Sequence, residues 1–173
     1  MEKQTAGRNQ LGEFAPKFAQ LNDDVLFGEV WAREVYAEDE ETKEEHGGMF
    51  GLGEPNVNYA QYFIGNSYLK PLTEPGKSSI FIANVTFEPG CRNNWHIHHS
   101  TKNGGQILIC VAGSGWYQEY GKDKVSLEPG MVITIPANVK HWHGAKDDSW
   151  FSHIAVEVPG ENTSTEWLEK VEE

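Results

Sequence analysis

Short runs of apolar residues, separated by turns that contain glycine or proline, fill the second half of this 173-residue chain. Evenly spaced short strands with such turns are typical of an all-β sandwich or barrel. The turns include two Glu-Pro-Gly sequences, at 88–90 and 128–130. We therefore predict a β-sandwich or barrel, with strands at 79–87, 106–111, 115–120, 132–135 and 151–158.

Two short histidine clusters lie among these strands. His96 and His98 are two residues apart, so in an extended segment both imidazoles project from the same face. Gln106 begins an apolar run that we interpret as a buried strand, and His141 follows another such run. Three imidazole nitrogens and one amide oxygen could therefore converge inside one small barrel, which is the outline of a metal site. The alternative is that these side chains are hydrogen-bonded polar groups of a barrel without a metal.

The spacing of these residues resembles the first of the two sequence motifs of the cupin family. That motif has a glycine, five residues and then His-x-His, which Gly90, His96 and His98 match. The family then has a glutamate, six residues and a glycine, and here Gln106 and Gly113 stand at those places. The gap before the glutamine is longer than in the family, which predicts a loop that bulges out between the histidines and the glutamine.

The second cupin motif has a glycine, five residues, Pro-x-Gly, two residues and a histidine, and Gly130, Pro136 and His141 match it. Asn138 replaces the motif's second glycine, which is a mild change because asparagine tolerates a left-handed backbone. Ala145 replaces the asparagine that ends the motif. The resemblance covers roughly residues 80–158 and implies an all-β cupin (jelly-roll) β-barrel. It also implies a set of metal ligands, namely His96, His98, Gln106 and His141.

This ligand set has a definite chemical character. Three imidazoles and one amide carry no negative charge, so a bound divalent ion keeps its full charge and is a strong Lewis acid. The same lack of a carboxylate weakens binding of the ion. Nitrogen and amide oxygen ligands suit a divalent transition metal such as manganese, iron, zinc or nickel. Four protein ligands leave further positions open, as in catalytic sites.

Two more histidines are candidate catalytic groups. His143 follows His141 by two residues, so on a continued strand it points to the same face. His153, at the start of the last predicted strand, could also project into the barrel. A neutral histidine titrates near neutral pH and is a natural general acid or base beside a metal-bound substrate. For both residues the alternative is a hydrogen bond to a ligand or a surface position.

The stretches around the ligands are similar to those of the manganese-dependent hydroxynitrile lyases of the family. Both have a Trp-His-x-His segment, here 95–98, a glutamine at the fourth ligand position, and a His-Trp-His-Gly-Ala segment, here 141–145. This resemblance implies a metal-dependent enzyme of lyase or isomerase type, in which a histidine moves a proton while a C–C bond to cyanide is made or broken. An iron-dependent cupin dioxygenase and a non-catalytic cupin that binds a small molecule are the alternatives.

The first part of the chain differs from the rest. Residues 11–36 carry apolar side chains mostly three or four positions apart, which is helical periodicity. This segment resembles the opening helices of the carboxymuconolactone decarboxylase family, without the Cys-x-x-Cys pair of its peroxidase branch. We predict a short α-helical N-terminal arm that ends in an acidic linker, 1–48, and a barrel domain, 49–173, whose tail at 162–173 forms a C-terminal helix.

Charge and hydropathy restrict the partners. The formal net charge is −12, and the sequence offers no basic face of the kind that nucleic acid requires. No window approaches the ~18 apolar residues of a membrane span. The N-terminus lacks the apolar core of a secretion signal, and two cysteines fit a reducing compartment. We therefore expect a cytoplasmic homodimer or higher homo-oligomer that acts on a small molecule, with no nucleic-acid or membrane partner.

Overall fold

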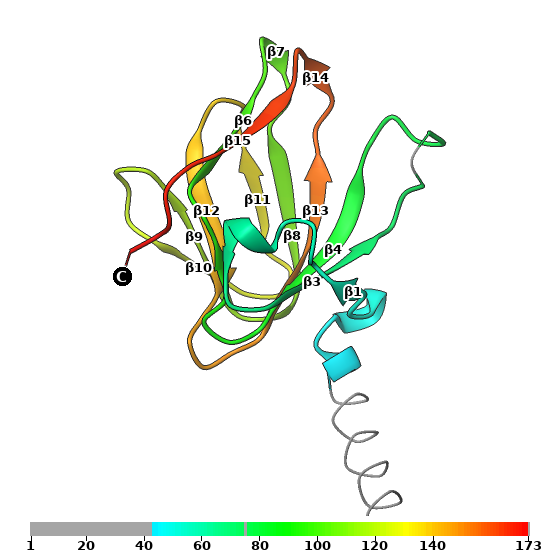
Figure 1. The fold of residues 1–173 in the computed structure, drawn as a ribbon, viewed down its shortest axis with the longest axis vertical. Coiled ribbons are helices and arrows are strands. Elements are labelled where there is room, and N and C mark those ends of the chain that lie inside the picture. Colours follow the sequence, from blue (N-terminus) through cyan, green and yellow to red (C-terminus); the bar gives the residue numbers. More distant parts are fainter. Residues whose placement is uncertain (1–42, 75, 173) are drawn as a thin grey trace, which may run out of the picture. The chain divides into compact units, whose positions relative to one another are not determined.

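The computed structural model describes residues 43–172 except residue 75. The predicted helices at 11–36, and the resemblance to the carboxymuconolactone decarboxylase family, lie outside the described residues. Within the described part the chain is mostly β-strand, as predicted, and two sheets curl around a common core (Figure 1). No helix in this part has the length and apolar character that crossing a membrane requires.

The first sheet has six strands, and all of its pairings are antiparallel. Its strands, in order across the sheet, are β1 (Glu54–Pro55), β3 (Ser67–Pro71), β4 (Ile82–Phe87), β13 (Phe151–Glu157), β8 (Gln106–Gly113) and β11 (Val132–Ile135). Neighbours in the sheet are far apart in sequence, since β13 lies between β4 and β8. The first sheet therefore depends on long-range pairing rather than on hairpins alone.

The second sheet has seven strands and carries the histidine clusters. Its main path is β10 (Val125–Leu127), β9 (Gly115–Glu119), β12 (Lys140–Ala145), β5 (Arg92–Asn93) and β2 (Phe63–Ile64). A side branch consists of β6 (His96–His99), which pairs with β12, and β15 (Ser164–Trp167), which pairs with β6. Two short 3-10 turns precede β2: η2 (Gly48–Phe50) and η3 (Ala60–Tyr62).

Alternation along the strands places the core between the two sheets. On β8, Leu108 and Cys110 are buried, while Ile109 between them is 38% exposed. The buried side chains from both sheets form one apolar cluster, which includes Phe87, Phe151 and Leu127. Successive residues of a strand point to opposite faces. This alternation of buried and exposed residues is therefore expected for a curled sheet with one face on the core and one in solvent.

The longer gap in the first motif does form a projecting feature. Strand β7 (Lys102–Asn103) pairs with β14 (Gly160–Glu161) in a small two-stranded sheet at one end of the barrel (Figure 1). Asn138 has φ 65°, the left-handed conformation expected where the family motif has glycine. The longer gap and the asparagine are therefore accommodated locally.

The predicted C-terminal helix is wrong. Residues 164–167 form β15, which pairs antiparallel with β6 from Ser164 opposite His99 to Trp167 opposite His96. The unpaired edge of β6 offers backbone hydrogen bonds to the tail, whereas an isolated helix of this length has little stability of its own. Trp167 does fix the tail to the barrel, since its ring stacks on Tyr62 at 4.6 Å between centroids.

Residues 44–52 lie against strand β4 and the start of β13. The side-chain amide of Asn84 donates to the carbonyl oxygens of Gly47 and Gly51, at 2.8 and 2.9 Å. The ring of His46 stacks on Trp150, with 4.2 Å between centroids. The division of the chain at residue 48 stays a prediction, and these contacts belong to the described part alone.

Candidate metal centre

Three imidazoles meet inside the barrel. His96 and His98 project from the same side of β6, and His141 lies opposite His96 in the antiparallel pair of β12 and β6. One ring nitrogen of each residue lies within 4.8 Å of those of the other two. All three side chains are buried. The His-x-His spacing and the pairing of two strands therefore produce the cluster that the sequence predicts.

Backbone carbonyls fix the orientation of two of these rings. His96 Nδ1 lies 2.9 Å from the carbonyl oxygen of Asn94, and His141 Nδ1 lies 2.9 Å from that of Val139. A carbonyl oxygen only accepts, so Nδ1 carries the hydrogen in both rings. The lone pair of each neutral imidazole is then on Nε2, which is the arrangement found in metal-binding histidines.

A carboxylate that we did not predict fixes the orientation of the other two candidate ligands. Glu157 Oε2 lies 3.2 Å from His98 Nδ1, and Glu157 Oε1 accepts a hydrogen bond of 2.7 Å from Gln106 Nε2. Thr165 Oγ1 lies 3.3 Å from the same nitrogen of His98. Because only the NH₂ end of the amide can donate to a carboxylate, the oxygen of Gln106 is directed elsewhere.

Alternation in the last strand could have shown on which face Glu157 lies, but not which residues it contacts. Residues 153, 155 and 157 share one face of β13, and a position inside the barrel was one of the alternatives for the first of these. In the register of β13 and β8, Glu157 lies opposite Gln106. Sequence alone does not contain that register, so the contact could not be derived.

The atoms left over fit a metal ion. His98 Nε2, His141 Nε2 and Gln106 Oε1 are buried and have no hydrogen-bond partner in the described structure. A buried polar atom without a partner is costly, so such atoms usually mark a ligand or an ion. Together with His96 they offer nitrogen and neutral oxygen donors, a set that suits a divalent transition metal.

The electrostatic environment keeps these groups in the protonation states that metal binding requires. Burial, reinforced by the charges of His141 and His98, holds the pKa of His96 well below its usual range. Burial also lowers the pKa of His141 to about 4. Burial would raise the pKa of Glu157, but hydrogen bonding and the charge of His98 outweigh it and leave that pKa below its ordinary value. At neutral pH these two imidazoles are neutral and the carboxyl group is ionised.

The two predicted catalytic histidines lie next to the cluster. His143 projects from β12 with its ring centroid 5.6 Å from that of His96, and Asn93 Nδ2 lies 3.2 Å from its Nε2. The ring of His153, on β13, is 4.8 Å from that of His143, and among residues 43–172 neither nitrogen of His153 has a hydrogen-bond partner. Burial holds the pKa of His143 well below its usual range and lowers that of His153 to about 4.

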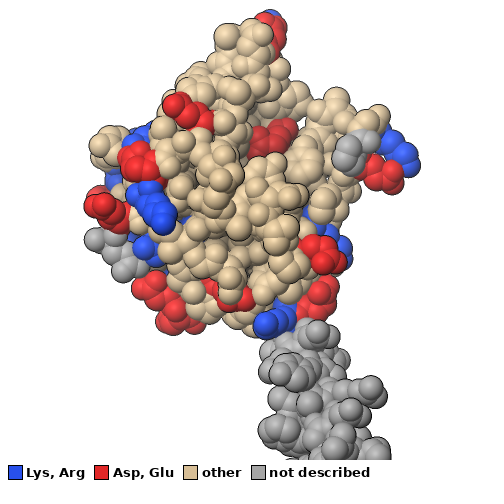
Figure 2. Space-filling view, in the orientation of Figure 1, with Lys and Arg blue, Asp and Glu red and all other residues tan. Residues whose placement is uncertain are grey.

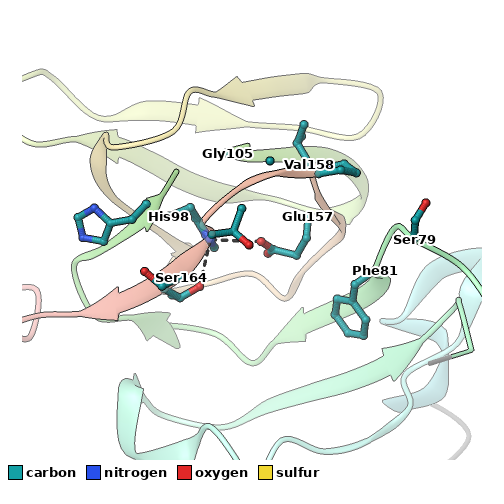
Figure 3. A pocket seen from close by; sticks show the side chains of 12 residues that line it. Ser79, Phe81, His98, Gly105, Glu157, Val158 and Ser164 are labelled. Carbon is teal, nitrogen blue, oxygen red and sulfur yellow. Dashed lines mark hydrogen bonds and ion pairs between the residues drawn. The ribbon is translucent and has the colours of Figure 1, made fainter. Parts of the chain in front are cut away.

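A pocket of about 460 Å³ opens beside the cluster. His98 and Glu157 form one side of it, and Ser79 and Phe81 lie at the other side (Figure 3). Figure 2 shows a hollow on this face of the molecule, with an acidic side chain at its base. The pocket therefore gives solvent a route to a candidate ligand and to the carboxylate behind it.

Other charged residues near the site lie outside the pocket wall. Lys140 pairs with Glu169 and its Nζ lies 4.2 Å from the centroid of the Tyr120 ring. Lys102 Nζ is 3.5 Å from a carboxylate oxygen of Glu161. Neither lysine lines the pocket. On the face drawn in Figure 2, the described Lys and Arg side chains are scattered among Asp and Glu rather than gathered in one area.

Comparisons with known proteins agree with this fold. The family profile described as "Cupin domain" matches residues 83–156. A relative named (R)-mandelonitrile lyase, from Granulicella tundricola, is 36% identical over 113 residues, which are 65% of this chain and 83% of the relative. An acireductone dioxygenase from Bacillus cytotoxicus is 33% identical over 75 residues, 41% of each protein, so the match spans less than half of that enzyme.

A solved structure has the same architecture. The crystal structure of a cupin-like protein from Thermotoga maritima aligns with a TM-score of 0.63 and 39% sequence identity, covering 72% of this chain and 91% of that one. The family profile covers the strands that carry all four candidate ligands, His96, His98, Gln106 and His141. The Cupin domain profile matches this chain, and the chain is 39% identical to the cupin-like protein of known structure over 91% of that protein. The chain therefore belongs to the cupin superfamily.

Proposed function

We propose that this protein is a metal-dependent cupin enzyme of lyase type, in which His96, His98, Gln106 and His141 hold one divalent transition-metal ion. One observation supports this above all. The outward-facing atom of each ligand side chain is hydrogen-bonded to a carbonyl or carboxylate oxygen, which leaves three Nε2 atoms and one amide oxygen facing inward. Binding of a cation is the one role that we find for buried, neutral donor atoms arranged in this way.

When bound, a divalent ion supplies Lewis-acid polarisation of a hydroxyl or carbonyl oxygen. The protein contributes orientation and proton transfer. His143, a neutral imidazole next to the cluster, accepts the hydroxyl proton of a cyanohydrin at a ring nitrogen. The bond to the nitrile carbon then breaks, its electron pair leaves with cyanide, and the carbonyl product forms. Cyanide takes the proton back and departs as hydrogen cyanide. His153 packs against His143 and limits how that ring can turn.

The lyase assignment is supported by the relative named (R)-mandelonitrile lyase, most of whose length this chain matches. A second candidate is an iron-dependent dioxygenase, which the shorter match to acireductone dioxygenases favours. The two differ in what they consume. A lyase works without oxygen, whereas a dioxygenase takes up oxygen and requires ferrous iron. The third candidate is a protein that binds a small molecule without converting it. It predicts only that the ligand stabilises the folded protein.

Elemental analysis of protein purified without added metal tests the metal centre. We expect about one transition-metal ion per chain in the wild type, as a mononuclear site requires, and none in the His96→Ala/His141→Ala variant. His99→Ala is the matched control, because His99 belongs to the same strand but is partly exposed and bonded to Glu166. A wild-type protein that contains no metal and takes none up on reconstitution would overturn the proposal.

Activity assays then choose between the candidates. Cyanohydrin cleavage in the absence of oxygen, lost in the double variant and kept in His99→Ala, is the expected result. Oxygen uptake that depends on ferrous iron, without cyanohydrin cleavage, would show that the protein is a dioxygenase and not a lyase.

A further inference from the structure

We propose that Glu157 is a positioning residue of this centre, which orients two of the four ligands and brings the negative charge that the ligands themselves lack. The inference rests on the proposed metal site and goes beyond it, because it concerns a residue outside the ligand set. It also modifies the expectation that the positive charge of an ion held by these neutral ligands is not offset.

The orientation of Gln106 depends on this carboxylate. The two ends of a side-chain amide have nearly the same shape, but only the oxygen can bind a metal ion. Gln106 Nε2 donates to Glu157 Oε1 at 2.7 Å, and Gln106 Oε1 is buried without a partner. Without an acceptor at residue 157, a half-turn of the amide would present the NH₂ group to the ligand cluster at little cost.

The orientation of His98 depends on the same side chain. The other two imidazoles are held by backbone carbonyls, which no substitution removes. His98 Nδ1 instead has side-chain partners, Glu157 Oε2 at 3.2 Å and the hydroxyl of Thr165 at 3.3 Å. A hydroxyl can donate or accept, so the carboxylate is the partner that requires a hydrogen on Nδ1 and leaves Nε2 free to bind.

The sheet holds Glu157 in place without help from an ion. Its backbone N–H donates to the carbonyl oxygen of Phe81 at 3.0 Å, and in the β13–β8 ladder it lies opposite Gln106. Figure 3 shows its side chain pointing toward His98, with a dashed line between them. The positioning device is therefore built into the fold, and it lowers the net charge of an occupied centre by one unit.

Cobalt affinity separates this role from a merely structural one. Glu157→Gln keeps the size of the side chain and removes its charge, and Glu166→Gln is the matched control, because Glu166 bonds to the non-ligand His99 at 2.7 Å. Affinity for Co²⁺ is measured by competition with a chelator, together with the visible absorption spectrum of bound Co²⁺. We expect Glu157→Gln to bind about 10- to 100-fold more weakly, as for other residues that support metal ligands, with a changed spectrum. Glu166→Gln should match the wild type.

An exchange of the two side chains gives a second test. Gln106→Glu places two carboxylates in contact, whereas Gln106→Glu/Glu157→Gln restores one carboxylate and one amide in reversed positions. We expect the double variant to bind Co²⁺ more tightly than Glu157→Gln alone. Equal affinity and equal spectra in wild type and Glu157→Gln would overturn the inference while leaving the metal site intact. Failure of the wild type to bind Co²⁺ would overturn the metal site, and this inference with it.

Discussion

At the scale of single residues, the chemistry depends on histidines that stay neutral inside an apolar barrel. His143 is buried between the candidate ligands and His153, with the amide of Asn93 directed at its ring. Burial, with the charge of His153, lowers its pKa. Its imidazole is therefore neutral at neutral pH and can accept a proton, and it is not one of the candidate ligands.

This position predicts a separation of activity from metal content. We expect His143→Gln to lower kcat for cyanohydrin cleavage by about 100- to 10,000-fold, the usual contribution of general acid–base catalysis, while the protein keeps its ion. Metal analysis and steady-state kinetics on the same preparation check this, with His99→Gln as the control. Loss of the ion together with activity would instead make His143 a ligand, and retained activity would remove it from the mechanism.

His153 predicts a pH dependence of stability. Burial lowers its pKa to about 4 in the folded protein, whereas an exposed histidine has a pKa of about 6.5. Between these values the unfolded chain binds the proton and the folded chain does not. Stability contributed by the neutral form is therefore complete above pH ~6.5 and is lost as pH falls toward 4, by about 1.4 kcal/mol per pH unit for each such histidine.

Urea unfolding of the metal-free protein at several pH values between 7 and 5 tests this. His153→Phe removes the titrating ring and keeps an aromatic side chain beside Phe87 and Phe151. Below pH 6.5 we expect the free energy of unfolding of this variant to decline less steeply with falling pH. The difference in slope should correspond to about one proton fewer taken up on unfolding. The same slope in both proteins would contradict a neutral His153 in the folded state.

At the scale of elements, the tail strand supports the ligand strand. Trp167 on β15 stacks on the ring of His96, with 4.7 Å between centroids, and on Tyr62. We expect Trp167→Ala to lower the free energy of unfolding by about 1–3 kcal/mol and to weaken Co²⁺ binding, because His96 loses a neighbour. Trp116→Ala is the control, since the ring of Trp116 faces Lys124 and Lys146 instead. Equal metal affinity in the two variants would limit Trp167 to packing.

Strand β15 also shows which features the sequence could predict and which it could not. The His-x-His pair, the inward glutamine and the histidine after Pro136 follow from alternation and motif spacing, which are local properties. The helical prediction at 162–173 failed because pairing with β6, more than sixty residues earlier, outweighs a local preference. Glu157 was missed for a related reason, since its partner Gln106 is 51 residues away and is fixed only by the register of β13 and β8.

At the scale of the whole molecule, the first sheet has an outer face with exposed apolar residues. Val132 on β11 and Ile109 on β8 lie opposite each other in the ladder, and they are 57% and 38% exposed. Single exposed apolar residues are common on monomers, but exposed apolar neighbours on two paired strands are suited to a contact with a second copy. This surface is a candidate contact for the homodimer or higher homo-oligomer that the sequence analysis predicts.

We therefore expect a mass of twice one chain by light scattering at micromolar concentration, and a single-chain mass for Val132→Glu. A dimer needs about 800 Å² buried per partner, and a carboxylate in the middle of such an apolar contact would be buried unpaired. Val125→Glu is the control, because Val125 is 42% exposed on β10 of the other sheet. A monomeric wild type, or a dimer that Val125→Glu separates and Val132→Glu does not, would show that the chain does not associate through the β8–β11 face.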